Sequence, residues 1–388
     1  MRILAIETSC DETAISIIEN KGSKLKVLSQ IISSQIALHA EWGGVVPSLA
    51  KREHSRNLVP LLKQALTESG LIKKASGPTK KSHVTIGAAS ELEKILEREQ
   101  ELLQQFLEFI PTIDTPKLDA IAVTRGPGLE PALWVGINLA RALNIVWDIP
   151  LVPINHLEGH LASVLLNNKK PVKFPLLGLI VSGGHTELVL AKDWLKYKLI
   201  GATRDDAAGE AFDKVARILG LPYPGGPAIG KLALHGSLEP DYKLPRPMIN
   251  SGDFDFSFSG LKTSVLYLVK KITEKGDLTQ IQRADIARQF QQAVIDTLIT
   301  KTMNAITKYK PKTLVIGGGV IANEELRRQF ELAITKIHPD VALLVPEAKL
   351  TTDNATMIAA AAYLRLKTGK KLSNKPEDLT AKGNLSLS

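Results

Sequence analysis

Two stretches of the chain decide its fold. They are RILAIETSCDETAISIIE, from Arg2 to Glu19, and LLGLIVSGGHTELVLA, from Leu176 to Ala191. Each has an apolar segment, a short turn of small and polar residues, and a second segment rich in apolar residues, which is the pattern of a strand, a tight turn and a strand. Segments with helical periodicity follow each hairpin. This repetition predicts two similar α/β lobes that face each other across a cleft.

The fold class predicted from this duplication is α/β. The pattern is that of the two-lobed actin-like ATPase (ASKHA) fold, with duplicated α/β domains around a cleft. A chain of 388 residues is too long for one ordinary core, which agrees with two lobes. We expect a first lobe over residues 1–155 and a second over 156–348. A C-terminal helix over 349–371 is expected to pack back on the first lobe, and residues 372–388 to form a loose polar tail.

A segment from about residue 73 to 115 differs from the rest of the first lobe. Its start is rich in lysine, glycine and proline, which predicts a loop. From Leu92 to Leu107, apolar residues recur at three- and four-residue spacings among glutamates, which predicts one amphipathic helix. We interpret the segment as an insertion. Its helix is expected to cover its own lobe, and a contact with a partner is the alternative.

Charge and composition limit the partners and the compartment. The chain has 49 Lys and Arg against 40 Asp and Glu, a formal net charge of +9, which favours an anionic partner such as nucleic acid. No apolar run approaches the roughly 20 residues of a membrane helix, so no membrane association is expected. The N-terminus enters directly into a predicted strand without signal-peptide features, and the single Cys10 cannot form an intrachain disulfide. We expect a cytoplasmic protein.

Two histidines, His156 and His160, lie four residues apart, directly after the apolar run 149–154. Asn155 is placed as the N-cap of a helix, so both imidazoles would project from one helical face. Such a pair is half of a metal site, and surface or capping histidines are the alternative. Asp353, at a second strand-to-helix junction, is the candidate for a third ligand. Two imidazoles and one carboxylate would leave coordination positions open for substrate oxygens.

The nearby Glu158 raises the alternative of a zinc peptidase. In the His-Glu-x-x-His motif of those enzymes, the glutamate directly follows the first histidine. Here Leu157 has that position, and Glu158 is one residue further on and points to another side of the helix. The spacing therefore argues against a peptidase.

Several segments in the second half of the chain are typical of a nucleotide-binding cleft. The turn at Ser182–Gly184 ends a buried strand and offers backbone amides to an anion, although a plain structural hairpin would have the same sequence. Asp213 lies in an acidic segment and would accept hydrogen bonds from ribose hydroxyls, whereas surface acids are the alternative. The rigid turn 223–227 and the triple glycine 317–319, with Asn323 beyond it, bring further backbone to a bound ligand.

The motifs of the chain resemble those of one known family, the tRNA N6-adenosine threonylcarbamoyltransferases, called TsaD in bacteria. They cover nearly the whole chain except the insertion and the tail. The motifs that carry the resemblance are IETSCDET at 6–13, GGVVP at 43–47, GPGL at 126–129, NHLEGH at 155–160, VSGGHT at 181–186, the segment from Asp205 to Lys214, DFSFSGLKT at 255–263 and TDN at 352–354.

This resemblance implies a set of ligands and a reaction. His156, His160 and Asp353 match the family's metal ligands, which implies one divalent metal per chain, Fe²⁺ or alternatively Zn²⁺. The positions that match contacts with threonylcarbamoyl-adenylate are Ile180, Val181, Ser182, Gly183, Gly184, Asp213, Gly226 and Asn323. The implied reaction passes the threonylcarbamoyl group to N6 of the adenine at position 37 of tRNAs that read codons beginning with A. The implied partners are tRNA and proteins of the TsaB and TsaE type.

Two other functions are alternatives to this one. An actin-like kinase or ATPase for a small molecule would explain the glycine turns but not the histidines with Asp353. A catalytically silent scaffold, as the paralogue TsaB is, would keep the fold without the ligands. The sequence does not identify the residue that removes the amine proton, and Asp11 and Glu12 are candidates for it. The chain departs from many relatives at Gly230, where they have a carboxylate, and at residues 129–134.

Overall fold

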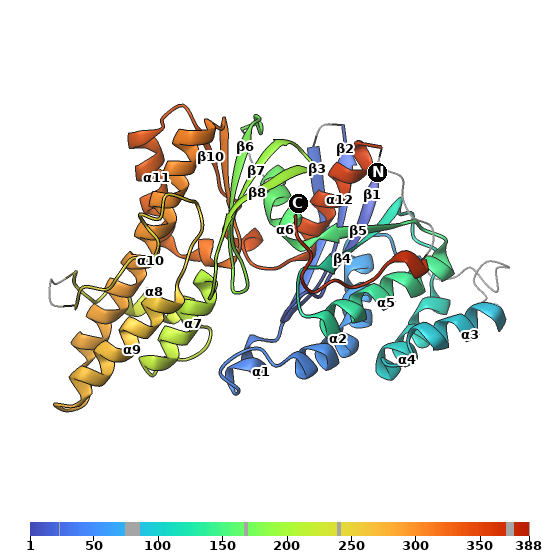
Figure 1. Ribbon diagram of the computed structural model, residues 1–388. Helices are drawn as coiled ribbons and strands as arrows, with labels where there is room; N and C mark the ends of the chain where they lie inside the picture. The colour runs from blue at the N-terminus through green and yellow to red at the C-terminus, as the bar shows by residue number, and fades with distance from the viewer. Residues whose placement is uncertain (23, 74–85, 167–169, 239–241, 370–375, 388) are drawn as a thin grey trace. The chain divides into compact units, whose positions relative to one another are not determined.

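The computed structural model describes residues 1–22, 24–73, 86–166, 170–238, 242–369 and 376–387. The chain divides into two compact units. Unit 1 comprises Met1–Ala37, Val45–Asn167 and Asp353–Leu387, and unit 2 comprises Leu38–Gly44 and Asn168–Thr352. Each unit is built around one five-stranded sheet (Figure 1).

The sheet of unit 1 has the strand order β3-β2-β1-β4-β5. Its strands are β1 (Arg2–Glu7), β2 (Glu12–Lys21), β3 (Lys24–Ser34), β4 (Ala120–Gly126) and β5 (Leu151–Asn155). The strands β1 to β3 pair antiparallel, as the hairpin sequence predicts, whereas β4 is parallel to both β1 and β5. Parallel strands need crossover connections, and helices supply them here. The carboxyl ends of β1, β4 and β5 therefore meet at one edge of the sheet.

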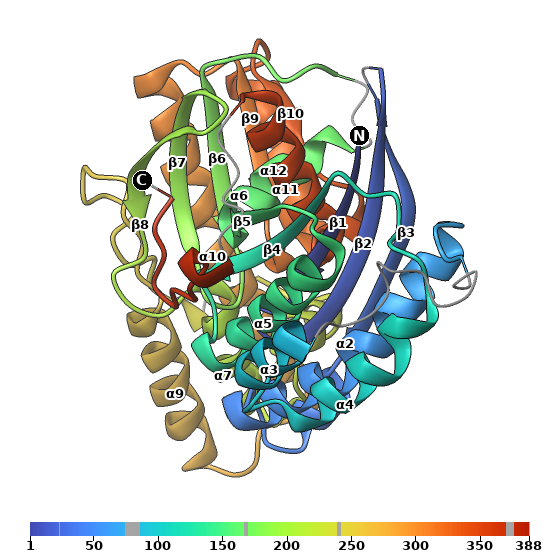
Figure 2. The same cartoon turned by 90° about the vertical axis from the view of Figure 1, so that its right-hand side faces the viewer.

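Helices cover both faces of this sheet. They are α2 (Pro47–Glu68), α3 (Ile86–Ile95), α4 (Gln100–Phe109), α5 (Glu130–Trp147), α6 (His156–Ala162) and α12 (Ala355–Lys367), and the short α1 (Ile36–Ala40) precedes α2. Side chains alternate between the two faces of a sheet along each strand, so the residues of β2 show which helices pack on each face. Ile15 and Ile17 belong to the core that α2 and α5 share, whereas Ser16 Oγ lies 2.9 Å from Thr356 Oγ1 on α12. Figure 2 shows α2 and α4 next to one another beside β3.

The sheet of unit 2 repeats this topology. Its order is β10-β9-β6-β7-β8, with β6 (Leu176–Val181), β7 (Thr186–Asp193), β8 (Lys196–Ala202), β9 (Thr313–Gly317) and β10 (Ala342–Leu344). The first three strands again pair antiparallel, and β9 is again parallel to both β6 and β10. The duplication predicted from the two hairpins is therefore confirmed in strand order and direction.

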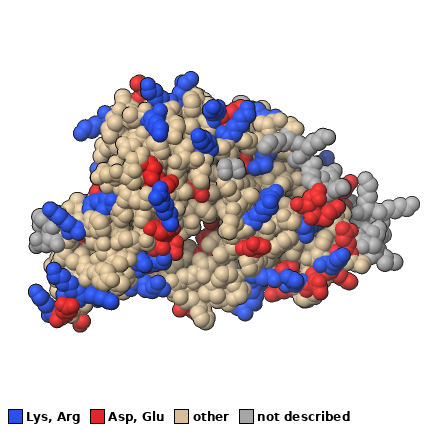
Figure 3. Space-filling model, viewed as in Figure 1, with Lys and Arg blue, Asp and Glu red and all other residues tan. Residues whose placement is uncertain are grey.

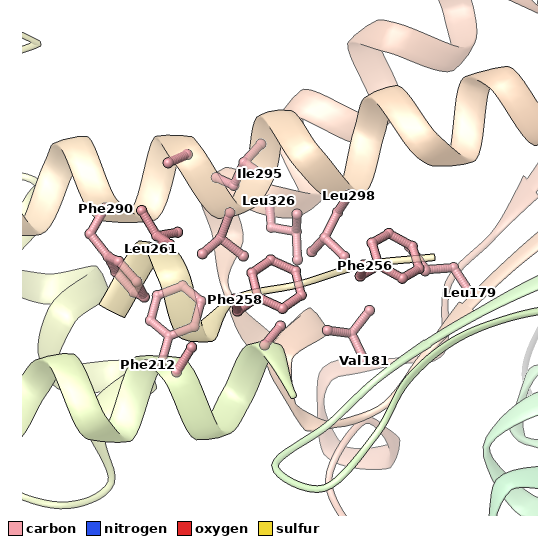
Figure 4. Packing of buried hydrophobic residues seen from close by; sticks show 14 of the residues in the cluster. Leu179, Val181, Phe212, Phe256, Phe258, Leu261, Phe290, Ile295, Leu298 and Leu326 are labelled. Carbon is pink, nitrogen blue, oxygen red and sulfur yellow. The ribbon is translucent and has the colours of Figure 1, made fainter. Parts of the chain in front are cut away.

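The helices of unit 2 enclose a core rich in phenylalanine. They are α7 (Ala208–Ile218), α8 (Gly225–Ala233), α9 (Ser259–Thr273), α10 (Gln280–Tyr309) and α11 (Glu324–Ile337). Phe212 on α7 contacts Phe290 on α10 edge to face, with ring centroids 5.1 Å apart, and Phe256 and Phe258 lie beside them (Figure 4). These rings hold α7 and α10 together next to the sheet. Among the described helices, none is both long and apolar enough to span a membrane.

The segment interpreted as an insertion contains two helices, α3 and α4, rather than the single helix we expected. The break lies between Ile95 and Gln100, where the Glu99 side chain is buried and ion-paired with Lys51 Nζ at 3.0 Å. Asn138 Nδ2 donates to the same carboxylate at 3.1 Å. The backbone of Glu99 is not helical, with φ −126° and ψ 58°, and it precedes the first residue of α4. The leucines of the pattern do pack on unit 1, as the buried Leu92 and Leu102 show. The lysine-rich start of the segment, 74–85, lies outside the described residues.

Two of the expected boundaries differ in the structure. The first unit extends past residue 155 to include α6, because this helix packs closely on α12. The C-terminal residues 376–387 are also not loose. Leu379 and Ala381 are buried in the core of unit 1, and Lys382 N donates to Arg125 O at 2.8 Å. The buried Leu379 and Ala381, together with this backbone pairing, anchor the tail.

Candidate functional site

Both histidines lie on α6, the helix that starts where β5 ends. Asn155 caps it: its Oδ1 accepts hydrogen bonds from Leu157 N at 2.8 Å and Glu158 N at 3.4 Å. Capping satisfies amides that have no partner within the helix and fixes the first turn. All seven residues of α6 are buried. The local sequence therefore places His156 and His160 one above the other on an inward face.

Asp353 completes a three-residue cluster with the two histidines. His156 Nε2 is 3.4 Å from Asp353 Oδ1, and His160 Nε2 is 3.3 Å from the same oxygen. The two imidazoles meet edge to face, with centroids 4.7 Å apart. The aspartate is fixed by its neighbour, because Asn354 Oδ1 caps α12 by accepting from Met357 N at 3.0 Å. All three residues belong to unit 1.

These distances suit a metal ion. Bonds of about 2.0–2.2 Å from one metal place neighbouring ligand atoms roughly 3.0–3.4 Å apart. Both ring nitrogens of His160 are buried without a directed hydrogen bond among the described residues, although Nε2 approaches Asp353 closely. A buried polar atom without a partner is costly, and a bound cation would remove that cost for Nε2. The donor set and its geometry therefore fit a divalent metal.

The protonation tendencies of the cluster agree with a cation-binding role. Burial raises the pKa of Asp353, but the charges and hydrogen bonds of His156 and His160 together outweigh burial and hold that pKa well below its usual range. Burial lowers the pKa of His160, which keeps this ring neutral. Burial also lowers the pKa of His156, yet the charges of Asp353 and Glu7 raise it well above its usual value. Without a metal, a proton on His156 thus supplies positive charge between two carboxylates.

Glu7 is a residue of this site that sequence reasoning missed. Its Oε2 is 3.2 Å from His156 Nδ1, on the side of the ring opposite the nitrogen that faces Asp353. Ser9 Oγ is 3.1 Å from the same Nδ1. A sequence signal did exist: a glutamate at the end of the buried apolar strand β1 needs buried polar partners.

Close packing of α6 on α12 holds the ligands together. A Cβ atom on Gly159 would lie 2.9 Å from Ile358 Cδ1 and 3.1 Å from Met357 Cγ, so glycine allows the helices to approach. On another side of α6, Glu158 forms an ion pair with Arg365 of α12. This pairing gives Glu158 a structural role, in keeping with the spacing argument against a peptidase.

The two carboxylates considered as bases lie in the turn between β1 and β2 and at the start of β2. Burial and the neighbouring charge of Asp11 raise the pKa of Glu12 to about 10. A protonated carboxyl group cannot accept a proton, so Glu12 is not a base at neutral pH in the metal-free chain. The negative charge of Asp353 contributes to this shift.

In unit 2, five of the expected substrate-binding residues, 180–184, lie at the end of β6 and in the turn after it. Ile180 and Val181 are buried at the end of β6, and the turn after them is closed by a hydrogen bond from Ser182 N to His185 O at 2.8 Å. The Cβ positions of Gly183 and Gly184 face open space. The backbone of this turn is therefore accessible, as an anion-binding turn requires.

Contacts within unit 2 connect the other expected residues to this turn. Gly209 N, in the first turn of α7, donates to Ser182 O at 3.2 Å. Further along α7, Asp213 Oδ1 accepts from Gly225 N at 2.7 Å, which fixes the start of α8 beside Gly226. This hydrogen bond occupies one of the two carboxylate oxygens that we expected to contact ribose. Asp213 thus also stabilises the turn at 223–227, through this hydrogen bond to Gly225.

Asn323 lies next to Gly230 of α8. Its Oδ1 caps α11 by accepting from Leu326 N at 3.0 Å, and its Nδ2 donates to Gln291 Oε1 at 2.8 Å. A Cβ on Gly230 would lie 3.5 Å from Asn323 Nδ2. Gly230, where the sequence analysis noted a departure from the family pattern, is therefore adjacent to Asn323.

Much of the acidic segment before α7 has internal partners. Asp205 Oδ2 accepts from Ser257 Oγ at 2.6 Å and from Ser259 Oγ at 2.7 Å, and Asp206 pairs with Lys214 at 2.7 Å. Ser257 and Ser259 thus bind Asp205, while Phe256 and Phe258, which alternate with them, enter the core. Two of the acids in the cluster therefore serve the fold.

The repeated sheets define an α/β protein of the two-lobed actin-like class. The crystal structure of full-length HypF in the phosphate- and nucleotide-bound form superposes with a TM-score of 0.53 at 12% identity. That similarity covers 95% of this chain but 56% of HypF. At this identity, it supports the fold alone.

Sequence comparison then gives the family. A family model described as TsaD, tRNA N6-adenosine threonylcarbamoyltransferase, matches residues 26–76 and 92–360, so residues 77–91 lie outside it. The transferase of this name from Kosmotoga olearia is 44% identical over 370 residues, covering 95% of this chain and 94% of that protein. The one from Chromobacterium violaceum is 43% identical over 369 residues, with the same coverage. The chain belongs to the tRNA N6-adenosine threonylcarbamoyltransferase family.

Proposed function

We propose that this chain transfers the threonylcarbamoyl group of threonylcarbamoyl-adenylate to N6 of the adenine at position 37 of tRNAs that read codons beginning with A. A bond forms between N6 and the carbamoyl carbon, the bond from that carbon to the phosphate oxygen breaks, AMP leaves, and N6 loses one proton. The observation that carries the proposal is the convergence of the buried His156 and His160 with the half-buried Asp353 in a chain of this family.

His156, His160 and Asp353 would hold one divalent metal, and we propose Fe²⁺, with Zn²⁺ as the alternative. Two imidazoles and one carboxylate with open positions are a common ligand set for Fe²⁺. When bound, such a metal supplies a Lewis acid for the carbamoyl oxygen, which suits a weak aromatic amine nucleophile. The chain's own contribution is orientation, because the capped helices α6 and α12 fix all three ligands before substrate binds.

Substrate recognition is proposed for unit 2. The exposed backbone of Ser182–Gly184 would bind an anionic group of the adenylate, with Ile180 and Val181 fixing the strand behind it. Asp213, Gly226 and Asn323 would contact the nucleoside. The chain of contacts through Gly209 and Gly230 supports this assignment, because it connects these residues within one unit.

The proposed macromolecular partners are tRNA and proteins of the TsaB and TsaE type, in the cytoplasm. A net charge of +9 favours binding to an RNA backbone. Figure 3 shows Lys and Arg interspersed with Asp and Glu on the visible face. On that face the positive charge is distributed rather than gathered in one patch.

The reaction is tested by incubating the purified protein with threonylcarbamoyl-adenylate and tRNA, with and without the partner proteins. Mass spectrometry of the digested tRNA should detect threonylcarbamoyladenosine. Its absence under every partner combination would contradict the transferase.

The metal assignment needs a separate test. Elemental analysis should find one metal per wild-type chain and none in His156→Ala. The exposed His235→Ala is the matched control and should keep its metal. Full retention of metal in His156→Ala would remove the proposed ligand set.

A further inference from the structure

Glu7 is a fully buried carboxylate at the end of β1, beside the histidine pair. Burying an ionised carboxylate costs several kcal/mol unless its oxygens are satisfied. Oε1 accepts from Ser9 N at 2.6 Å, and Oε2 accepts from Thr124 Oγ1 on β4 at 2.6 Å. These two donors come from the turn after β1 and from the neighbouring strand. They fix the position of the carboxylate before any metal binds.

The contact between this carboxylate and His156 determines where the imidazole carries its proton. Glu7 Oε2 lies 3.2 Å from His156 Nδ1. An ionised carboxylate can only accept hydrogen bonds, so the proton of this contact belongs to Nδ1. A neutral ring then has its lone pair on Nε2, the nitrogen that faces Asp353 at 3.4 Å. Ser9 Oγ, 3.1 Å from the same Nδ1, is a second acceptor for that proton.

We propose that Glu7 is a positioning residue that holds His156 in the tautomer with the proton on Nδ1 and directs Nε2 at the metal. This inference rests on the metal site proposed above. A carboxylate behind a ligand histidine fixes the orientation of the ring and raises its basicity. His160 differs, because its Nδ1 is buried without a hydrogen-bond partner among the described residues. Glu7 therefore orients one of the two imidazoles selectively.

The test compares Glu7→Gln with wild type in the binding of Co²⁺ and Zn²⁺, measured by competition with a coloured chelator. Glutamine keeps the shape of the side chain but removes its charge and one acceptor oxygen. We expect an affinity about 10- to 100-fold lower and a changed visible spectrum of bound Co²⁺. Glu99→Gln is the matched control: it neutralises another buried carboxylate of unit 1, whose partners are Lys51 and Asn138 rather than an imidazole. It should leave the Co²⁺ spectrum unchanged.

The outcomes separate this inference from the proposed metal site. Equal affinity and an identical Co²⁺ spectrum in Glu7→Gln would overturn the role of Glu7 and leave the site standing. Failure of the wild type to bind either metal would overturn both. If Glu7→Gln does not fold, nitrogen NMR of isotope-labelled histidines in the Zn²⁺-loaded wild type decides. The His156 ring, assigned by the signal lost in His156→Gln, must carry its proton on Nδ1, and a proton on Nε2 would refute the inference.

Discussion

Glu158 on α6 and Arg365 on α12 form a buried ion pair, in which Arg365 Nε lies 3.2 Å from Glu158 Oε2 and Nη2 lies closer still. The Glu158 side chain is 1% exposed and that of Arg365 27%. One partner belongs to the helix with both histidines, and the other to the helix that begins directly after Asp353. The pair therefore joins the two elements that hold the proposed metal ligands.

Arg365→Met should destabilise the protein, because it leaves the buried Glu158 carboxylate without this cation. We expect the free energy of unfolding to fall by about 2–4 kcal/mol, measured by urea denaturation. Arg56→Met is the control, since Arg56 pairs with Glu53 at the surface of α2 and should cost under about 1 kcal/mol. The double variant Arg365→Met with Glu158→Gln should recover part of the loss. Equal costs for Arg365→Met and Arg56→Met would contradict the prediction.

Gly209→Ala should displace the turn that follows β6. The new Cβ would lie 2.7 Å from Ser182 O and 2.9 Å from Gly183 Cα, and backbone atoms cannot move aside as a side chain can. We expect a loss of about 1–3 kcal/mol in thermal unfolding, despite the better helix propensity of alanine, and a higher KM for the adenylate. In the control Gly260→Ala, the atom nearest to the new Cβ would be Pro247 Cγ at 3.6 Å, an ordinary van der Waals contact. If both variants behaved alike, the close approach would have no consequence.

Stability at alkaline pH should depend on Glu12. Its folded pKa is raised to about 10 by burial and by Asp11, whereas the unfolded value is about 4.3. Between these values the unfolded chain has lost a proton that the folded chain keeps. The stability that the protonated Glu12 contributes to the fold is therefore complete below about pH 4 and declines as the pH rises toward 10.

Metal-free Glu12→Gln should accordingly gain stability over metal-free wild type as the pH rises from about 5 to 9. Urea midpoints measured across this range in the presence of a chelator would show the difference growing. The exposed Glu68→Gln should show no such trend. A gap between Glu12→Gln and wild type that stays constant with pH would argue against a raised pKa.

Leu379→Ala should test whether the C-terminal segment is packed. Leu379 is 5% exposed in the core of unit 1, so its truncation should cost about 2–4 kcal/mol in urea denaturation. Leu332 on α11 is 57% exposed, and Leu332→Ala should change little. A negligible effect at Leu379 would mean that the segment is as loose as its polar composition predicted.

Much of the fold could be predicted because its signals are local. The hairpins at Arg2–Glu19 and Leu176–Ala191 were recognisable from their apolar segments and turn residues, and their repetition predicted the duplicated topology. The helix break between Ile95 and Gln100 could not be predicted in this way. Apolar spacing continues across it, and the buried ion pair at the break forms with Lys51 from α2 only in the folded unit. The packed tail was missed for the same reason, since Leu379 reaches its core only in the folded unit.

The proposed metal centre likewise has one part that local sequence predicts and another that depends on tertiary contacts. The sequence by itself determined that His156 and His160 share one face of a capped helix, because a spacing of four residues and an Asn cap act through local backbone geometry. Only the tertiary structure brought Glu7 to Nδ1 of His156 and Asp353 to Nε2. Those contacts depend on the order of β1, β4 and β5 and on the packing of α12 against α6. Local spacing carries no information about such distant elements, whereas the sheet order and helix packing determine their positions directly.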